Sequence, residues 1–263
     1  DLGNDFYGCW LDDTMSYSSA IFAGDDDTLE QAQHRKNSRL LTRLDLEKGA
    51  SLLEIGCGWG GLAQQALSAH DVEYHGITLS GEQKAYADTR LAPFGNQARV
   101  TITDYREISA QYDAIASVEM VEAVGHQYWP AYLEKLASTL KPGGKAALQY
   151  IAIADDIFDQ YASGQDFIQR YIFPGGMLLS ESRFRAAAQQ AGLTWEDPEY
   201  FGMDYARTLH QWRQNFEAAV DAGKLPSGFD EKFVKLWRFY LMYCEGGFRG
   251  GGIDVAQVTL TKP

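Results

Sequence analysis

An apolar run that breaks into four glycines constrains the fold of this chain more than any other feature. The run begins at Leu53 and reads LEIGCGWGGL, with Glu54 as its single acid. A chain gives up side chains at this density where a ligand or another backbone segment must approach closely. A buried strand that leads through such a loop into a helix is typical of α/β proteins that bind nucleotide-like ligands.

Alternating β-rich and helical segments follow between residues 51 and 153, which predicts a mostly parallel sheet covered by helices. We expect a first helix at 61–69 and a second from Ser80, where SGEQ has the form of a capping box. The sequence KPGG at 141–144 is predicted to be a turn between a helix and the fifth strand. Five strands are expected, at 51–56, 72–78, 99–104, 112–119 and 145–153.

The C-terminal part of the chain ends in a segment, 253–263, that alternates with period two and predicts a strand that closes the sheet. Before it, helices are expected near 180–191, 205–222 and 229–244. The sequence CEGGFRGGG at 244–252 lacks the lysine and the serine or threonine of a phosphate-binding P-loop, so we interpret it as a turn into the last strand.

Composition excludes several classes of function. Lysine and arginine number 23 against 36 acids, and the resulting net charge of -13 makes nucleic acid an unexpected partner. The sequence has no apolar run long enough to span a bilayer. Cys9, Cys57 and Cys244 suggest neither a disulfide framework nor a zinc site, which favours a reducing cytoplasm. The five histidines have no metal-binding spacing, so no metal is expected.

The glycine loop supports two interpretations. Gly56, Gly58 and Gly61 satisfy GxGxxG, but a dinucleotide site also needs an acid at the end of the second strand, where this chain has HGITLS. In the alternative, Glu54 and the glycines through Gly60 approach the methionine part of S-adenosylmethionine. Asp104 and Tyr105 at the next strand end would then hold adenine by a polar group and an aromatic face. The second interpretation explains more residues.

The chain resembles the cyclopropane fatty acid synthase family, whose members methylenate cis double bonds of membrane lipid acyl chains. The similarity runs from residue 1 to residue 260. The matching segments are DLGNDFYGCWLDDTMSYSSAIF, LEIGCGWGGLA, GITLSGEQ, DYRE, SVEMVEAVG, DFIQRYIFPGGMLLS, FGMDYARTLHQWRQNF and YLMYCEGGFRGGGIDVAQVTL.

The resemblance implies an α/β fold of the Rossmann-like class I methyltransferase type. The expected sheet is mostly parallel and seven-stranded, with helices on both faces and a helical, aromatic-rich cap. We expect a single catalytic domain, and because the chain begins with Asp1 rather than Met we expect an N-terminal domain to be absent from it. Its parts would be an N-terminal helical cap (1–48), a cofactor-binding core (49–153), a substrate-side insertion (154–200) and C-terminal helices with the last strand (201–263).

The resemblance also implies S-adenosylmethionine as the cofactor and identifies its contacts. Thr78 and Gln83 are neutral, which accounts for the missing acid, because the family holds the adenosine there without a carboxylate. The implied contacts are Tyr17, Ser18, Gly56, Cys57, Gly58, Thr78, Leu79, Gln83, Tyr105 and Arg106, to which the interpretation of the glycine loop adds Glu54, Gly60 and Asp104.

A bicarbonate ion beside the reactive methyl is implied as well, as a general base. Its ligands in the family are a cysteine, a glutamate, a histidine or glutamine, a backbone group and a tyrosine. The corresponding catalytic positions are Ser19, Glu122, Gln149, Ile151 and Tyr205. Serine replaces the thiol at one of them, and the Gln149 amide cannot gain a proton. The sequence leaves open whether Glu119, on the same strand end as Glu122, has a role.

These departures bear on the product. The family reaction leaves a carbocation that loses a proton from the new methyl carbon, and nearby aromatic faces stabilise such a cation. Aromatic candidates are Tyr17, Phe22, Tyr128, Trp129, Tyr171, Phe173, Phe201 and Tyr205. If the base is weakened or moved, proton loss from a neighbouring carbon gives a methylene- or methyl-branched chain instead of a cyclopropane. A lipid-binding protein without catalysis and a dinucleotide oxidoreductase are the alternatives from other classes.

The expected partners are the acyl chain of an unsaturated phospholipid, a membrane contacted peripherally, and a second copy of the chain in a homodimer. We expect a cytoplasmic protein at the inner face of the membrane. Because the chain is acidic, docking needs local positive charge, for which Arg35, Lys36, Arg39 and Arg43 on one helical stretch are candidates, with Arg249 as a contact to a lipid headgroup.

Overall fold

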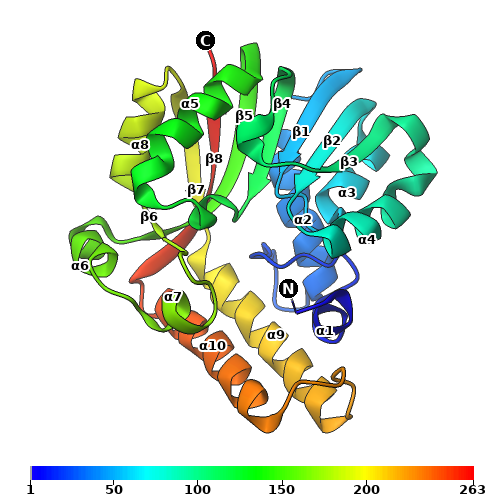
Figure 1. Ribbon diagram of the computed structural model, residues 1–263, viewed down its shortest axis with the longest axis vertical. Coiled ribbons are helices and arrows are strands. Elements are labelled where there is room, and N and C mark those ends of the chain that lie inside the picture. The colour runs from blue at the N-terminus through cyan, green and yellow to red at the C-terminus, as the bar shows by residue number, and fades with distance from the viewer. Residues whose placement is uncertain (1) are drawn as a thin grey trace.

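The computed structural model describes residues 2–263, so Asp1, the first residue of the first matching segment, lies outside the described residues. Its centre is a sheet with strand order β3-β2-β1-β4-β5-β8-β7, and β6 pairs with β5 beside this path (Figure 1). The strands are β1 (Ala50–Ile55), β2 (Val72–Thr78), β3 (Ala98–Ile102), β4 (Tyr112–Val118), β5 (Leu140–Ile153), β6 (Leu179–Ser180), β7 (Thr194–Tyr200) and β8 (Ile253–Thr261).

The pairing is parallel from β3 to β5, and β8 is antiparallel to both of its neighbours. The predicted mostly parallel Rossmann-like sheet is therefore confirmed, with seven strands in its continuous path and the two-residue β6 beside it. The carboxyl ends of β1 to β5 lie along one edge, which is where ligands bind in open α/β sheets. The site residues predicted at the ends of these strands consequently share that edge.

Helices cover both faces because the strands are apolar on both sides. Leu53 of β1 packs with α5 and α8 on one face, and Leu52 packs with α2 and α3 on the other. The helices are α1 (Asn4–Gly8), α2 (Leu29–Thr42), α3 (Gly61–Ala69), α4 (Gly81–Leu91), α5 (Trp129–Thr139), α6 (Phe158–Ala162), α7 (Phe167–Tyr171), α8 (Glu181–Gln190), α9 (Gly202–Asp221) and α10 (Glu231–Arg249). Short 3-10 segments cover Ala92–Gln97, Tyr105–Glu107, Val121–Ala123, His126–Tyr128 and Asp155–Ile157.

A third core cluster lies beyond the carboxyl edge of the sheet, where α9 and α10 run side by side and the N-terminal segment packs against them (Figure 1). It contains aromatic residues from α1, from the loop that follows it and from both long helices. Residues from Phe6 to Ile21 thus pack with α9 and α10, whereas Leu40 and Leu41 of α2 pack against a face of the sheet.

One predicted turn is wrong, and a second is shorter than predicted because only residues 250–252 form it. The KPGG sequence lies inside β5, which begins at Leu140 and contains an irregularity where its register against β4 shifts; Gly143 has a φ of +78° there. Residues 244–249 belong to α10 rather than to a turn. A Cβ on Gly247 would lie 2.9 Å from the Ile253 side chain, so this glycine lets the helix pack against the start of β8.

The segment 154–200 contributes β6, α8 and the edge strand β7 to the sheet layers. Strand β7 has the sequence TWEDPEY. Its acids and proline do not form a typical strand pattern, but they are common in edge strands. Of the described helices, none combines the length and the apolar character needed to cross a bilayer.

Candidate active site

The glycine loop leaves β1 in a conformation that favours glycine. Gly56 has a φ of +81°, and a Cβ there would come within 3.0 Å of the Met120 side chain. Gly58 also has a positive φ, and a Cβ on it would meet no atom within 4 Å, so its backbone faces open space. Gly60 instead faces Ala87 of α4, which would lie 3.3 Å from its Cβ, so it serves helix packing.

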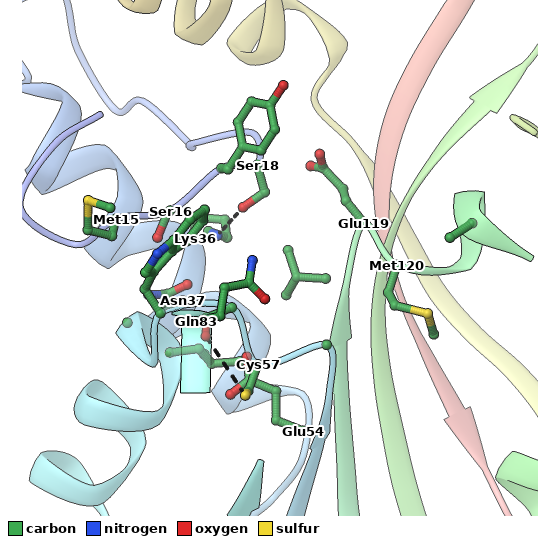
Figure 2. Close-up of a pocket in the computed structure, with 18 residues that line it drawn as sticks. Met15, Ser16, Ser18, Lys36, Asn37, Glu54, Cys57, Gln83, Glu119 and Met120 are labelled. Atoms are coloured by element: carbon green, nitrogen blue, oxygen red, sulfur yellow. Dashed lines mark hydrogen bonds between the residues drawn. The ribbon is translucent and has the colours of Figure 1, made fainter. Parts of the chain in front are cut away.

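A cavity of about 300 Å³ opens beside this loop (Figure 2). It is formed by the N-terminal segment, α2, the glycine loop, the start of α4 and the end of β4. Its lining residues are Met15, Ser16, Tyr17, Ser18, Lys36, Asn37, Glu54, Gly56, Cys57, Gly58, Trp59, Gly61, Leu62, Gln83, Val118, Glu119, Met120 and Ala123. The cavity therefore unites the predicted Tyr17, Ser18, Glu54, Gly56, Cys57, Gly58 and Gln83 with several residues that were not predicted.

Three buried polar side chains in this lining carry the strongest signs of a ligand. Lys36 is 2% exposed, donates to Ser18 Oγ at 2.9 Å, and burial lowers its pKa to about 8. Glu54 accepts a hydrogen bond from Tyr74, and burial raises the pKa of Glu54 to about 8. Asn37 is 1% exposed, and neither its Oδ1 nor its Nδ2 has a partner. A buried amide without partners is costly unless a ligand supplies them.

S-adenosylmethionine fits this set of groups. Its methionine part carries an ammonium and a carboxylate, which match Glu54 as acceptor and Lys36 and Asn37 as donors. The open backbone at Gly58 leaves room for close approach. The residues present are therefore those that a methionine-like ligand requires, and they would hold that end of the cofactor.

The residues predicted to hold the adenosine lie farther along the same edge of the sheet. Thr78, at the end of β2, donates to Gln83 Oε1 at 2.8 Å, and Gln83 reaches the cavity. Leu79 is 73% exposed, and Tyr105 packs edge-on against Tyr132. The described cavity lining does not include Thr78, Leu79, Gly60, Asp104, Tyr105 or Arg106.

Asp104 has a structural duty at that edge. Its carboxylate accepts hydrogen bonds from the Arg106 backbone and guanidinium, the latter at 2.6 Å, and these bonds lower the pKa of Asp104. The pair caps the short helix Tyr105–Glu107. It leaves the Tyr105 ring at the end of β3, where the sequence predicted an adenine contact.

Glu119 is the centre of a second group of polar contacts, at the end of β4. Its Oε1 accepts from the Ser19 backbone N–H at 2.9 Å and from Gln149 Nε2 at 2.7 Å. Its Oε2 accepts from the Tyr205 hydroxyl at 2.6 Å. Burial raises the pKa of Glu119, and these three donors oppose the increase. Figure 2 shows the carboxylate at the cavity, across from Ser18 and Lys36.

Glu122 lies one turn along the chain. Its Oε1 accepts from the Ile151 backbone N–H at 2.6 Å, and its buried Oε2 has no partner. Burial, followed by the charge of Glu119, raises the pKa of Glu122 to about 8. The five positions Ser19, Glu122, Gln149, Ile151 and Tyr205 are thus brought together around two carboxylates.

Bicarbonate does not fit this arrangement. The resemblance assigns Ser19, Gln149 and Tyr205 to the ion, but the Ser19 backbone N–H, the Gln149 amide and the Tyr205 hydroxyl all donate to Glu119 instead. The Ile151 N–H donates to Glu122. A further anion would therefore find these four donors already occupied and would meet the Glu119 carboxylate beside three of them, where like charges repel.

Aromatic rings enclose the Glu119 side of the site. We call Tyr17, Phe173, Tyr205, Trp212 and Tyr240 the aromatic wall. Tyr17 lies 5.4 Å from Trp212 between ring centroids and shares a 2.7 Å hydrogen bond with Tyr240. Tyr205 lies 6.1 Å from Trp212, and Phe173 lies 6.1 Å from Tyr240. Of the other candidates, Trp129 packs in the core against Phe158, Phe22 and Phe201 face arginines, and Tyr128 and Tyr171 are exposed.

The expected basic docking patch is wrong. Lys36 is buried in the site, Arg35 pairs with Asp27, and Arg39 and Arg43 both pair with Glu199. The pattern of α2 contained the signal that this interpretation missed. Gln33, Lys36 and Asn37 occupy helix positions at which the neighbouring turns place buried leucines, so polar side chains at those positions point inward. Within residues 2–263, His, Cys, Asp and Glu form no cluster suited to a metal.

Known proteins are similar to this chain in sequence and in architecture. A family model described as mycolic acid cyclopropane synthetase matches residues 1–258. Tuberculostearic acid methyltransferase of Mycobacterium tuberculosis is 40% identical over 275 residues, covering 100% of this chain and 63% of that protein. Cyclopropane-fatty-acyl-phospholipid synthase of Escherichia coli strain K12 is 36% identical, covering 100% and 66%. The chain thus spans about two thirds of the length of these relatives.

Solved structures agree with the sequence relatives. Mycolic acid cyclopropane synthase CmaA1, crystallised with SAH and CTAB, matches with a TM-score of 0.93 and 32% identity over 100% of this chain and 95% of that one. This match confirms the predicted fold and the resemblance inferred from the sequence. The chain therefore belongs to the mycolic acid cyclopropane synthetase family of S-adenosylmethionine-dependent methyltransferases.

Proposed function

We propose that this protein transfers the methyl group of S-adenosylmethionine to the cis double bond of an unsaturated fatty acyl chain of a phospholipid. The observation that carries the proposal is the position of Glu119. It lines the cofactor cavity and is hydrogen bonded to Tyr205 of the aromatic wall, so a base, a cavity and aromatic faces meet at one place. An alkene substrate needs these three features. The cavity brings the methyl donor to it, aromatic faces stabilise the cation that forms, and a base removes the proton that must leave.

Each part of the site has a task in this reaction. When bound, S-adenosylmethionine supplies an electrophilic methyl group on a sulfonium. Tyr17 and the other rings of the aromatic wall exclude water and stabilise the positive charge that develops on the acyl chain, each by about 0.5–2 kcal/mol. A buried carboxylate then takes the proton that must leave. Lys36, Glu54 and Asn37 hold the cofactor end that does not react.

Ring closure to a cyclopropane is the product that the family resemblance favours. It requires that the proton leave the newly attached carbon. The relative from Escherichia coli is named for this product. We propose cyclopropane formation as the first candidate.

C-methylation without ring closure is the second candidate, and a specific observation favours it. Glu119 accepts the hydrogen bonds of three residues that the resemblance assigns to the free ion, so the base is tied to β4 and its reach is fixed. A base that cannot move toward the new carbon takes the proton from a chain carbon next to the cation, which gives a methyl-branched chain that keeps a double bond. The relative from Mycobacterium tuberculosis at 40% identity is named as a tuberculostearic acid methyltransferase.

An exposed apolar surface on α10 supports contact with a membrane. Phe239, Met242 and Tyr243 are each at least 42% exposed, and Phe167 of α7 packs against the two aromatic ones. We propose that this surface associates peripherally with the inner face of the cytoplasmic membrane. The homodimer is a separate proposal, which light scattering tests. Changing the three α10 residues to serine should reduce co-sedimentation with phosphatidylglycerol vesicles, and unchanged binding would contradict the proposal.

The experiment that tests the function is incubation of the purified protein with methyl-labelled S-adenosylmethionine and vesicles of a monounsaturated phospholipid. We expect labelled fatty acids that are heavier by one CH2 unit. Proton NMR then separates the candidates, because cyclopropane protons resonate at high field and methylene protons in the olefinic region. The same assay with a saturated phospholipid is the control, and label in that lipid would contradict an alkene substrate.

A further inference from the structure

The Glu119 carboxylate accepts hydrogen bonds from three of the five residues that the family resemblance assigns to bicarbonate. A backbone N–H from the N-terminal segment, a side-chain amide from β5 and a hydroxyl from α9 converge on it at 2.6–2.9 Å. Three separate elements therefore build a site for a carboxylate, and the chain itself supplies that carboxylate. The donors are in turn held in place, because Gln257 of β8 donates to Gln149 Oε1 at 3.0 Å.

The backbone at Glu119 points in the same direction. Its φ is +48°, in the left-handed region that favours glycine, and a longer side chain is strained there. The backbone at Glu119 is nevertheless held by a 2.7 Å hydrogen bond from its N–H to the Gln149 carbonyl. Strained non-glycine residues of this kind gather at functional sites, where the neighbouring structure maintains them. Here the strained turn aims the carboxylate out of the strand and into the cofactor cavity.

We infer that Glu119 is the catalytic base of this enzyme and that the reaction needs no bicarbonate. The inference rests on the proposed methyl transfer to an alkene. Ser19, Gln149 and Tyr205 are positioning residues, since each holds the carboxylate. Glu122 occupies the Ile151 N–H, the backbone group that the resemblance assigns to the ion.

The step balances without another reactant. One alkene carbon forms a bond to the methyl carbon as the sulfur–methyl bond breaks, and the electron pair of that bond stays on sulfur. The other alkene carbon becomes positive. Glu119 accepts a proton either from the newly attached carbon, whose C–H electrons then close the ring onto the cation, or from a chain carbon next to the cation, whose C–H electrons then form a new double bond. The carboxylic acid then returns its proton to solvent.

The first test measures the wild-type protein in buffer stripped of carbon dioxide and in the same buffer with added bicarbonate. We expect equal initial rates of lipid methylation. A rate that collapses without bicarbonate and returns when it is added would overturn the inference, because the base would then be a free ion. This test needs no variant, so it does not depend on the folding of any variant.

The second test compares Glu119→Gln, Glu119→Gly and the surface control Glu73→Gln. Loss of a general base costs about 10²–10⁴-fold in rate. Glu119→Gln should show that loss with SAH binding intact, and Glu73→Gln, on the exposed side of β2, should match wild type. Glu119→Gly removes the strained side chain and frees its three donors, so added formate or bicarbonate should restore part of the rate in a saturable way.

The outcomes separate the inference from the function on which it rests. Wild-type methylation that persists in Glu119→Gln would overturn the role of Glu119 while leaving the proposed function in place. Glu119→Gly that binds SAH but is not rescued by either anion would count against the converging donors as a carboxylate site. A wild-type protein that methylates no unsaturated lipid under any bicarbonate concentration would overturn the proposed function, and the inference with it.

Discussion

Removing one hydroxyl group, in Tyr205→Phe, should slow the reaction without disturbing the fold. The Tyr205 hydroxyl donates to Glu119 Oε2 at 2.6 Å, and its ring stacks on Phe248 at 4.5 Å and meets Trp212 at 6.1 Å. Phenylalanine keeps the ring contacts and loses only the donor. A hydrogen bond to a charged group contributes about 1.5–3 kcal/mol, which corresponds to a loss in rate of about 10- to 150-fold.

The pH dependence gives this prediction its sign. The hydroxyl stabilises the charged form of Glu119 and so lowers its pKa against the opposing effect of burial. Without the hydroxyl the pKa of Glu119 rises, and the acidic limb of the rate profile should move to higher pH. A purely structural role of Tyr205 would not move that limb.

The assay is the initial rate of lipid methylation as a function of pH, with SAH affinity and thermal unfolding measured on the same samples. Tyr150→Phe is a matched control, because Tyr150 is also a buried tyrosine that donates to a glutamate, Glu181, at 2.7 Å, but lies in a different core cluster. It should lower stability and leave the rate and its pH profile unchanged. An unchanged acidic limb in Tyr205→Phe, with SAH affinity intact, would refute the reasoning.

Three further predictions concern the cofactor side of the site. Gly61→Ala should weaken SAH binding and lower the free energy of unfolding by about 1–3 kcal/mol, because the added Cβ would lie 2.5 Å from the Thr14 carbonyl. The control Gly81→Ala has open space around its Cβ, so urea titrations should find it neutral or slightly stabilising. Glu54 has a folded-state pKa of about 8, above its ordinary 4.5, so its contribution to stability is present at low pH and is lost as pH rises toward 8. Unfolding curves recorded from pH 4.5 to 8 should therefore show a smaller loss of stability with pH for Glu54→Gln than for the wild type. Lys36 has a folded-state pKa of about 8, below its ordinary 10.5, so between pH 8 and 10.5 the unfolded chain binds more protons than the folded one. Over that range the stability of the wild type should rise with pH relative to Lys36→Met. A stability difference between the two proteins that stays constant would contradict the burial of a charged Lys36.

Local pattern was sufficient for the central strands and their helices. The strand at 72–78 and the helix at 61–69 have the predicted bounds. Both are apolar segments bounded by glycine or by a capping serine, which marks where each element begins or ends. Strand β7 was not predicted, since an edge strand needs few apolar residues and its pairing partner, β8, lies far along the chain. The continuation of α10 through Gly246 and Gly247 was also missed, because the close contact that favours glycine there is tertiary.

The site was predictable only as far as its residues follow strand ends. The strand pattern placed Glu54 and Glu119 at one edge of the sheet, but the sequence does not say which of two glutamates at one strand end faces a cavity. That depends on the positive φ of Glu119 and on donors from Ser19 and Tyr205, which are distant in sequence. Lys36 was assigned to the surface for a related reason, since charge alone does not reveal which face of a helix it occupies.

Methyl transfer to an unsaturated lipid is the central claim, and one measurement tests it most directly. The purified protein is incubated with S-adenosylmethionine carrying a carbon-13 methyl group and with vesicles of a monounsaturated phospholipid, and the released fatty acids are analysed by mass spectrometry and NMR. We predict a fatty acid enlarged by one labelled CH2 unit at the position of the former double bond. Unlabelled fatty acids, from a protein that binds SAH under the same conditions, would contradict the account.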